Sequence, residues 1–151
     1  MGILATMRVS LSALTAQRVR MDVTASNLAN VDTTRTPQGG PYLRRQVVFA
    51  TEQPSPFARL VQTRTGLVET TPSAARGVQV AGIVVDRRAV REVYDPTHPD
   101  ADANGIVRYP DIDVVSEMTN LMAATRAYEA NVTVLDALKT MAMRALSIGR
   151  A

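Results

Sequence analysis

The last third of the chain, from Val114 to Ile148, is the longest stretch without proline or glycine, and its apolar spacing predicts one continuous helix. At about 1.5 Å per residue this helix would be roughly 50 Å long, more than a small domain drawn from the remaining chain can cover. Residues four and three apart form a heptad line along it, interrupted only by Lys139. The line consists of Val114, Met118, Leu121, Thr125, Tyr128, Val132, Leu135, Ala142 and Leu146.

A second line of small and apolar residues runs beside the first and leaves only a narrow polar strip. A helix that is apolar on two sides expects more than one packing partner. The second line consists of Ala123, Ala127, Ala130, Val134, Ala137, Met141, Ala145 and Ile148.

The head of the chain, from Ile3 to Ala29, carries a matching heptad pattern, which predicts a helix that pairs with the tail helix. Its other positions are rich in Thr, Ser and Val, so this helix should fray alone and form when packed. The main line of this pattern consists of Met7, Leu14, Met21 and Leu28. A companion line consists of Leu4, Leu11 and Ala25 and is interrupted by Arg18.

Two interpretations of these lines are open. The head and tail could form an antiparallel helical hairpin that closes one small domain. However, a single seam would leave the second line of the tail exposed, and exposed apolar stripes usually mark interfaces. We therefore expect that second line, through Ala130, Val134 and Met141, to meet neighbouring subunits.

All eight prolines lie between residues 37 and 110, which divides the chain into three parts. We expect an N-terminal helix in residues 1–31, a small β and loop region in residues 32–110, and a C-terminal helix in residues 111–151. The fold class is α+β, mainly α, with the terminal helices paired as an antiparallel coiled coil around an irregular middle. Strands are expected at 42–49 and 78–85, with 89–96 pairing to the latter, and a mobile loop at 50–76.

The composition excludes several functions. No cysteine is present, which excludes thiol chemistry. His98 is the single histidine and lies beside Pro99 in a polar loop, so we expect neither a Ser-His-Asp triad nor a zinc cluster. The net charge of +3 is scattered along the chain and does not indicate nucleic-acid binding. The start lacks the basic region of a secretory signal, and no stretch is long enough to span a membrane. We expect neither an enzyme nor a cofactor.

One loop resembles a calcium site. Asp100, Asp102, Asn104, Gly105 and Asp111 follow the spacing of an EF-hand loop, which makes a calcium-responsive helical binding module the alternative function. The final acid is Asp where Glu is usual, and proline blocks the exiting helix. We prefer Asx turns and a left-handed bend.

The tail helix should begin at a capping residue. Asp113 directly precedes it and is expected to be its N-cap, with Glu117 favourable near the positive end of the helix.

Three stretches of the chain carry a recognisable pattern. The first is ASNLANVDTTRTPQGGPYLRRQ, from Ala25 to Gln46, which contains Ser26–Asn30. The second runs from Val93 to Leu146 and joins HPDADANGIVRYP to EMTNLMAATRAYEANV, and the third is the heptad head. Together they resemble the bacterial flagellar basal-body rod proteins of the axial rod and hook family, and specifically their short proximal-rod member. In that family the Ser26–Asn30 signature is shared by axial proteins.

This resemblance implies a structural subunit that is exported unfolded through the flagellar type III apparatus, without a cleaved signal peptide, and stacked with itself and other rod proteins into a hollow helical tube crossing the periplasm. It also implies an export-gate adaptor at the rod base as a neighbour. The residues expected at the assembly interface are Met7, Leu11, Leu14, Met21, Leu28, Asn27, Asn30, Met118, Leu121, Tyr128, Val132, Val134, Leu135 and Met141.

Overall fold

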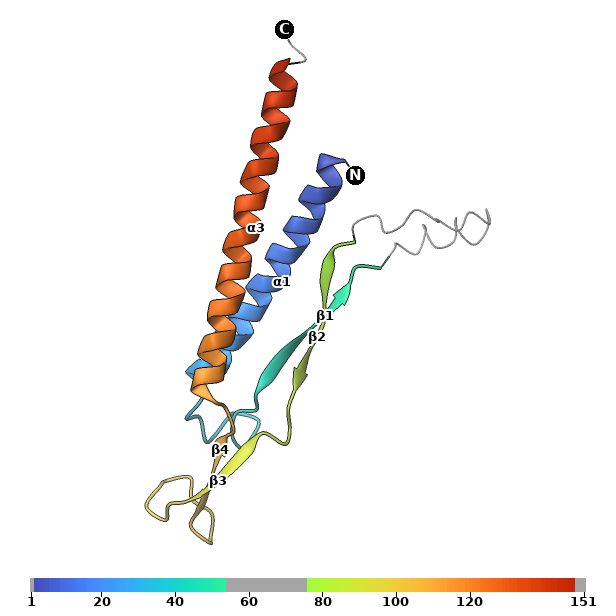
Figure 1. Cartoon of the computed structure of the whole chain (residues 1–151). Coiled ribbons are helices and arrows are strands. Elements are labelled where there is room, and N and C mark those ends of the chain that lie inside the picture. Colours follow the sequence, from blue (N-terminus) through green and yellow to red (C-terminus); the bar gives the residue numbers. More distant parts are fainter. Residues whose placement is uncertain (1, 54–75, 149–151) are drawn as a thin grey trace, which may run out of the picture.

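A computed structural model describes residues 2–53 and 76–148 of the chain and contains two long helices that pack together beside two small sheets (Figure 1). This architecture confirms the predicted fold class of paired terminal helices around a small β-containing middle. The elements are α1 (Ile3–Ala29), β1 (Arg45–Thr51), β2 (Val78–Val85), β3 (Val90–Tyr94), β4 (Ile106–Pro110) and α3 (Val114–Ile148).

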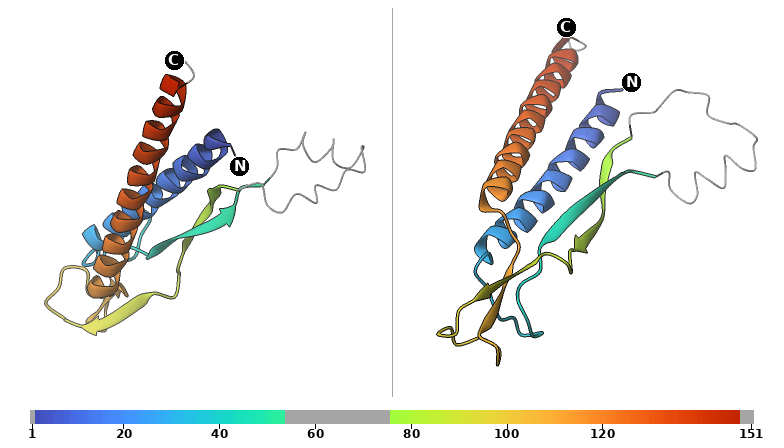
Figure 2. Two further views of the ribbon diagram at one scale, coloured as in Figure 1. Left: turned by 45° about the horizontal axis from the view of Figure 1, so that its top comes forward. Right: turned by 60° about the horizontal axis from the view of Figure 1, so that its bottom comes forward.

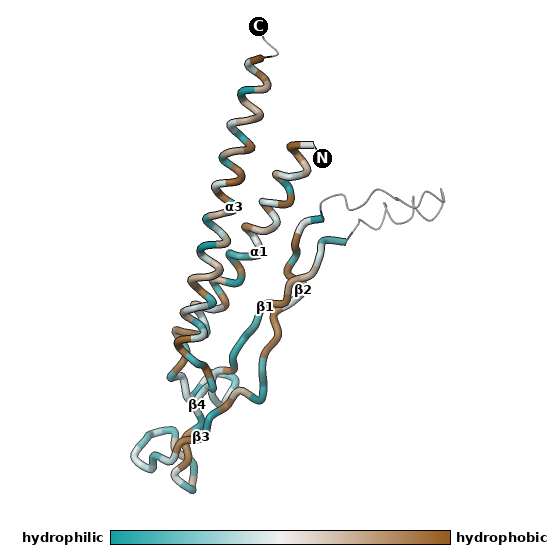
Figure 3. The backbone as a smooth tube through the Cα atoms, viewed as in Figure 1, coloured by the Kyte–Doolittle hydropathy of each residue, from teal (hydrophilic) through white to brown (hydrophobic). Residues whose placement is uncertain are grey.

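The two helices run antiparallel, so the described ends of both terminal segments lie at the same end of the molecule (Figure 1). Helix α1 lies between α3 and the β1–β2 hairpin, and contacts both (Figure 2). Helix α3 has 35 residues against 27 in α1, and it projects beyond its partner. Brown, hydrophobic segments recur along this projecting part (Figure 3). Its apolar side chains therefore have no partner in the described part of the chain.

The structure confirms part of the heptad line predicted along α3 and corrects the rest. Leu121, Tyr128, Leu135 and Ala142 are half-buried, as expected of residues that pack on α1, whereas Val114 and Leu146 at the two ends of the line are exposed. The other positions of the seam lie one residue before the predicted ones: Glu117, Ala124 and Leu138 are buried and Asn131 is half-buried, whereas Met118, Thr125, Val132 and Lys139 are exposed. Lys139 therefore does not interrupt the seam. Counting apolar residues misplaced this line because its true members include Glu and Asn.

Helix α1 buries mostly small residues: Ser10, Ala16, Thr24 and Asn27. Packing on two sides explains this choice, because small side chains let a helix approach two neighbours closely. The predicted main line, Met7, Leu14, Met21 and Leu28, is half-buried, and the companion line is exposed, with Leu4 82% and Leu11 55% accessible.

The four strands form two separate antiparallel pairs, which corrects the predicted pairing. β1 pairs with β2 and β3 with β4, whereas the sequence suggested that 89–96 pairs with 78–85. A turn at Asp86, which accepts the N–H of Arg88 at 3.0 Å, lies between β2 and β3. Tyr42 was expected in the first strand but lies before it, buried. The expected mobile loop at 50–76 falls mostly outside the described residues.

The β1–β2 hairpin docks on α1 through a close contact at Gly77. The N–H of Val78 donates to Ser12 Oγ at 3.0 Å, and Gly77 is buried directly beside this hydroxyl. A Cβ at Gly77 would lie 2.4 Å from Ser12 Oγ. Only glycine therefore fits this approach of strand to helix.

Helix α3 begins at the predicted N-cap. One carboxylate oxygen of Asp113 accepts the N–H of Val115 at 3.1 Å, and the other accepts the Ser116 hydroxyl at 2.6 Å. The Ser116 hydroxyl bond first, and the Val115 amide second, lower the pKa of Asp113 below its ordinary value of 3.8.

Gly77→Ala should loosen the hairpin from α1. Overpacking of this kind costs about 1–3 kcal/mol. Amide hydrogen exchange should show faster exchange in β1 and β2 than in the native chain. Gly82→Ala in the same hairpin is the control, since a Cβ there meets nothing within 4 Å. Equal exchange in both variants would contradict the docking contact.

Acid should weaken the start of α3. An acid whose pKa is lowered by folding stabilises the native state above its unfolded pKa, and this contribution is lost as the pH falls through the lowered value. We expect the amide shifts of Val115 and Ser116 to stay constant down to about pH 4 and to change below it. Asp113→Asn keeps a capping oxygen but should remove this transition, which NMR can follow. If the pH-dependent change in these amide shifts persists in the variant, another titrating group causes it.

Candidate assembly surfaces

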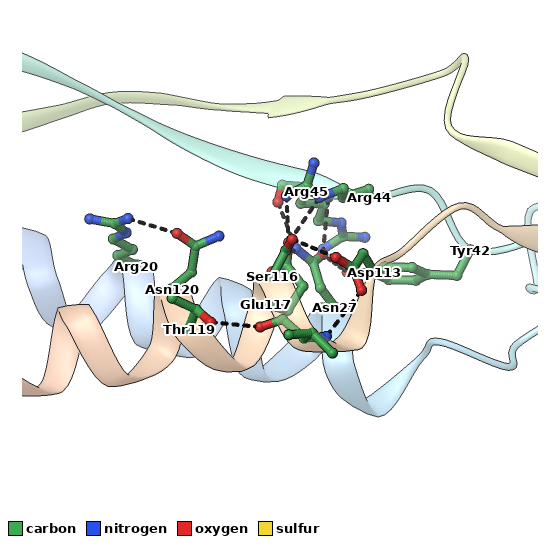
Figure 4. Close-up of polar contacts among 11 residues, drawn as sticks. Arg20, Asn27, Tyr42, Arg44, Arg45, Asp113, Ser116, Glu117, Thr119 and Asn120 are labelled. Carbon is green, nitrogen blue, oxygen red and sulfur yellow. Dashed lines mark hydrogen bonds and ion pairs between the residues drawn. The ribbon is translucent and has the colours of Figure 1, made fainter.

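A buried polar junction joins the end of α1, the start of β1 and the first turn of α3 (Figure 4). We define it as Asn27, Tyr42, Arg44 and Glu117. Asn27 is 1% and Glu117 3% exposed. Burial of such polar groups is costly unless every one of them is hydrogen-bonded. Their partners therefore decide whether this arrangement is stable.

The Glu117 carboxylate is neutralised by Arg44. Its Oε1 accepts Arg44 Nε at 2.9 Å and Nη2 at 2.6 Å, while its Oε2 accepts Asn27 Nδ2 at 3.1 Å. Both oxygens are thus satisfied by partners from two other elements. Removal of one partner from a buried ion pair is destabilising by about 3–5 kcal/mol, because a charge is left unpaired.

Asn27 makes four hydrogen bonds at the centre of the junction. Its Nδ2 donates to the carbonyl of Arg45 at 2.8 Å as well as to Glu117, and its Oδ1 accepts the N–H of Arg45 at 3.0 Å and the hydroxyl of Tyr42 at 3.1 Å. The amide pairs with the first residue of β1 as a neighbouring strand would. No other side chain offers this pattern of donor and acceptor in the same space.

Sequence reasoning missed the roles of Glu117 and Arg44. Glu117 was assigned to the helix dipole, and Arg44 was treated only as one of a short pair of arginines. The available signal was the line through Glu117, Ala124, Asn131 and Leu138 at intervals of seven, which places Glu117 on the buried seam.

The second apolar line of α3 is exposed, as the sequence predicts for a chain with a single helix seam. Val134 is 44%, Met141 52% and Ile148 78% accessible. The alanines at 123, 130, 137 and 145 are also exposed, and Ala127 is half-buried. The line forms a continuous stripe of small and apolar surface, which suits close packing of another helix.

The expected interface residues divide into two groups. Leu11, Met118, Val132, Val134 and Met141 are exposed and accessible to a neighbouring molecule. The others lie within the chain's own packing: Asn27 is buried, and Met7, Leu14, Met21, Leu28, Asn30, Leu121, Tyr128 and Leu135 are half-buried.

The loop with calcium-like spacing closes the β3–β4 hairpin by the predicted Asx turn. Asp102 Oδ1 accepts the N–H groups of Asn104 at 2.8 Å and Ile106 at 3.0 Å, and these bonds lower the pKa of Asp102. Gly105 takes a left-handed φ of 73°, the expected bend. Asp100 Oδ2 accepts a hydrogen bond from Thr34 Oγ1 at 2.7 Å, and Asp100 Oδ1 lies 3.7 Å from Arg35 Nη1.

Across residues 2–53 and 76–148, no three His, Cys, Asp or Glu side chains are grouped to hold a metal ion. His98 Nδ1 accepts the N–H of Asp100 at 3.1 Å, and its ring packs edge-on against Tyr109. In the same described ranges, neither helix is long and apolar enough to cross a membrane.

Two family models match the terminal segments of the chain. The model of the flagella basal body rod protein matches residues 7–35, and that of the flagellar basal body rod FlgEFG protein C-terminal region matches residues 103–148. The two matches cover α1 with the following turn, and β4 with α3.

Relatives match nearly the whole chain. Flagellar basal-body rod protein FlgC of Bacillus subtilis is 46% identical over 95% of this chain and 96% of its own length. The FlgC proteins of Borreliella burgdorferi and Escherichia coli O6:H1 are 40% and 43% identical, over 98% and 92% of both chains.

Arg44→Ala should destabilise the fold much more than Arg45→Ala. The first change leaves the Glu117 carboxylate buried without its cation and should cost about 3 kcal/mol or more. The second removes an exposed side chain and should cost about 0.5 kcal/mol. Urea unfolding followed by circular dichroism measures both. An equal loss of unfolding free energy in the two variants would show that the junction does not stabilise the chain.

Proposed function

The chain belongs to the FlgC family of flagellar basal-body rod proteins, and we propose that it builds the rod by packing its terminal helices against those of identical and related subunits. As a member of this family it is a structural protein and not an enzyme. It assembles with other rod proteins in the flagellar basal body. The surfaces that it uses and the route by which it arrives there belong to the proposal.

The observation that carries the proposal is the unpartnered apolar stripe of α3. Burying a side chain such as Val or Met contributes about 1.5–3 kcal/mol. Association costs about 4–15 kcal/mol in lost freedom of motion, more than one such side chain contributes, so a single contact of this kind is weak. In a rod, each subunit repeats the contact with several neighbours, which makes the assembly stable although each pair is weak.

Within this proposal the two groups of interface residues act differently. The exposed group, Leu11, Met118, Val132, Val134 and Met141, meets neighbouring subunits directly. The half-buried seam holds α1 on α3 so that these residues keep a constant spacing. Asn27 and Asn30 act where α1 ends: Asn30 Nδ2 donates to the Ser26 carbonyl at 2.8 Å, which supports the turn into the middle region.

The division of the chain into residues 1–31, 32–110 and 111–151 follows from this scheme, with the terminal parts forming the tube and the middle lying outside. We propose export as an unfolded chain through the flagellar type III apparatus, without a cleaved signal peptide, and contact with the export-gate adaptor at the rod base. The many Ser, Thr and Val residues of α1 support late ordering, since they disfavour the isolated helix.

Val134→Asp should block assembly and leave the isolated chain unchanged. Val134 is 44% exposed, so a carboxylate there remains solvated in the monomer but would be buried against a neighbour. Leu121 and Leu135 are less suitable targets, because their change would also disturb the helix pair. In cells that make the variant in place of the native chain, swimming in soft agar should fall by about ten-fold or more, with export unaffected.

Val134→Ala is the matched control and should swim normally, because it keeps the stripe small and apolar. Helix content by circular dichroism verifies that both variants fold alike. Normal swimming of the Val134→Asp variant would overturn the role of the stripe.

A further inference from the structure

A cleft of about 370 Å³ opens between α1, the start of α3 and β1. Val23, Val47 and Phe49 supply its apolar lining, and Arg20, Arg44 and Arg45 its charged groups. Glu117 is the one acid among its lining residues. Figure 4 shows the three arginines along this side of the helix pair.

Two of these arginines have no anionic partner among residues 2–53 and 76–148. Glu117 neutralises Arg44, whereas Arg20 donates to the neutral amide of Asn120 at 3.2 Å and the Arg45 guanidinium lies 5.4 Å from the centre of the Tyr42 ring. Within the described ranges, neither Arg20 nor Arg45 forms an ion pair. The cleft therefore combines apolar lining with two uncompensated positive charges.

The chain carries a surface of complementary character on α3. Glu129, Val132 and Asp136 are spaced three and four apart, so they share one helix face, and all three are exposed. Neither acid forms an ion pair with another described residue. The two carboxylates are separated by about 10 Å along the helix, with the valine between them.

We propose that the cleft receives the Glu129, Val132 and Asp136 face of a second copy of the chain. The two acids meet Arg20 and Arg45, and Val132 meets the apolar lining. This contact rests on the proposed rod function and assigns it a specific pair of surfaces. A shift by one helical turn would separate at least one acid from its arginine, so the charge pairs favour one alignment of neighbouring copies.

The proposed contact joins two different surfaces, so it is heterologous when the two copies lie parallel. The acidic face lies about 14 residues along α3 from the cleft, which displaces a parallel second copy by roughly 20 Å along the helix axis. Repetition of this displacement generates an open helical array. A rod requires this parallel arrangement.

Engineered cysteines test the contact directly, since the native chain has none. The full chain carrying both Val23→Cys and Val132→Cys is produced in cells in place of the native protein, and rods are oxidised and separated under non-reducing conditions. Within one chain these two positions lie about 15 Å apart along the axis of the helix pair, too far for a disulfide. We expect crosslinked dimers and larger multimers. The matched control pairs Val23→Cys with Ala130→Cys, on the other exposed side of α3, and should give at least about ten-fold less product.

Charge reversal provides the second measurement. Arg20→Glu with Arg45→Glu should reduce incorporation into rods by about ten-fold, since like charges then face each other. Adding Glu129→Arg and Asp136→Arg should restore at least about half of it, because the pairs are re-formed with opposite polarity. Circular dichroism controls for folding.

The outcomes separate the two proposals. If the unmodified chain enters rods but neither crosslinking nor rescue occurs, the contact is wrong and the rod function stands. Crosslinks of equal yield in the control pair would also overturn the contact. If the unmodified chain does not enter rods, the proposed function fails, and this contact fails with it.

Discussion

The buried carboxylate of Glu117 is the constraint on which the rest of the structure depends. A charge that is 3% exposed must be compensated, and its partners come from the end of α1 and from the start of β1. These partners lie 90 and 73 residues away in sequence. Satisfying one side chain therefore brings the head, the middle and the tail of the chain to one point and aligns the two helices.

Away from this junction few large side chains are buried. Deeply buried residues of α1 are small and partly polar, and buried residues of α3 are few. Many of the larger apolar side chains lie on the surface, among them Leu4, Met122, Met143 and Leu146. A monomer built in this way has limited stability of its own, because its apolar surface is only partly removed from water. Under the proposed function, the remaining burial occurs on assembly.

The two kinds of contact serve different purposes. Apolar stripes such as that through Val134 and Met141 tolerate sliding, because small and similar side chains repeat along the helix. In the proposed contact, charged groups such as Arg20 and Glu129 depend on position and penalise incorrect alignment. A rod subunit needs both properties, because many weak contacts must accumulate in one register.

The sequence by itself determined the two long helices, the N-cap at Asp113, the Asx turn at Asp102 and the surplus apolar line of α3, because each depends on local spacing or on a neighbouring residue. It also carried the family signature near Asn27. Only the tertiary structure decided the seam register, the strand pairing and the partners of Glu117. These depend on hydrogen bonds between distant segments, and the buried line of α3 contains Glu117 and Asn131, polar residues that a count of apolar positions passes over.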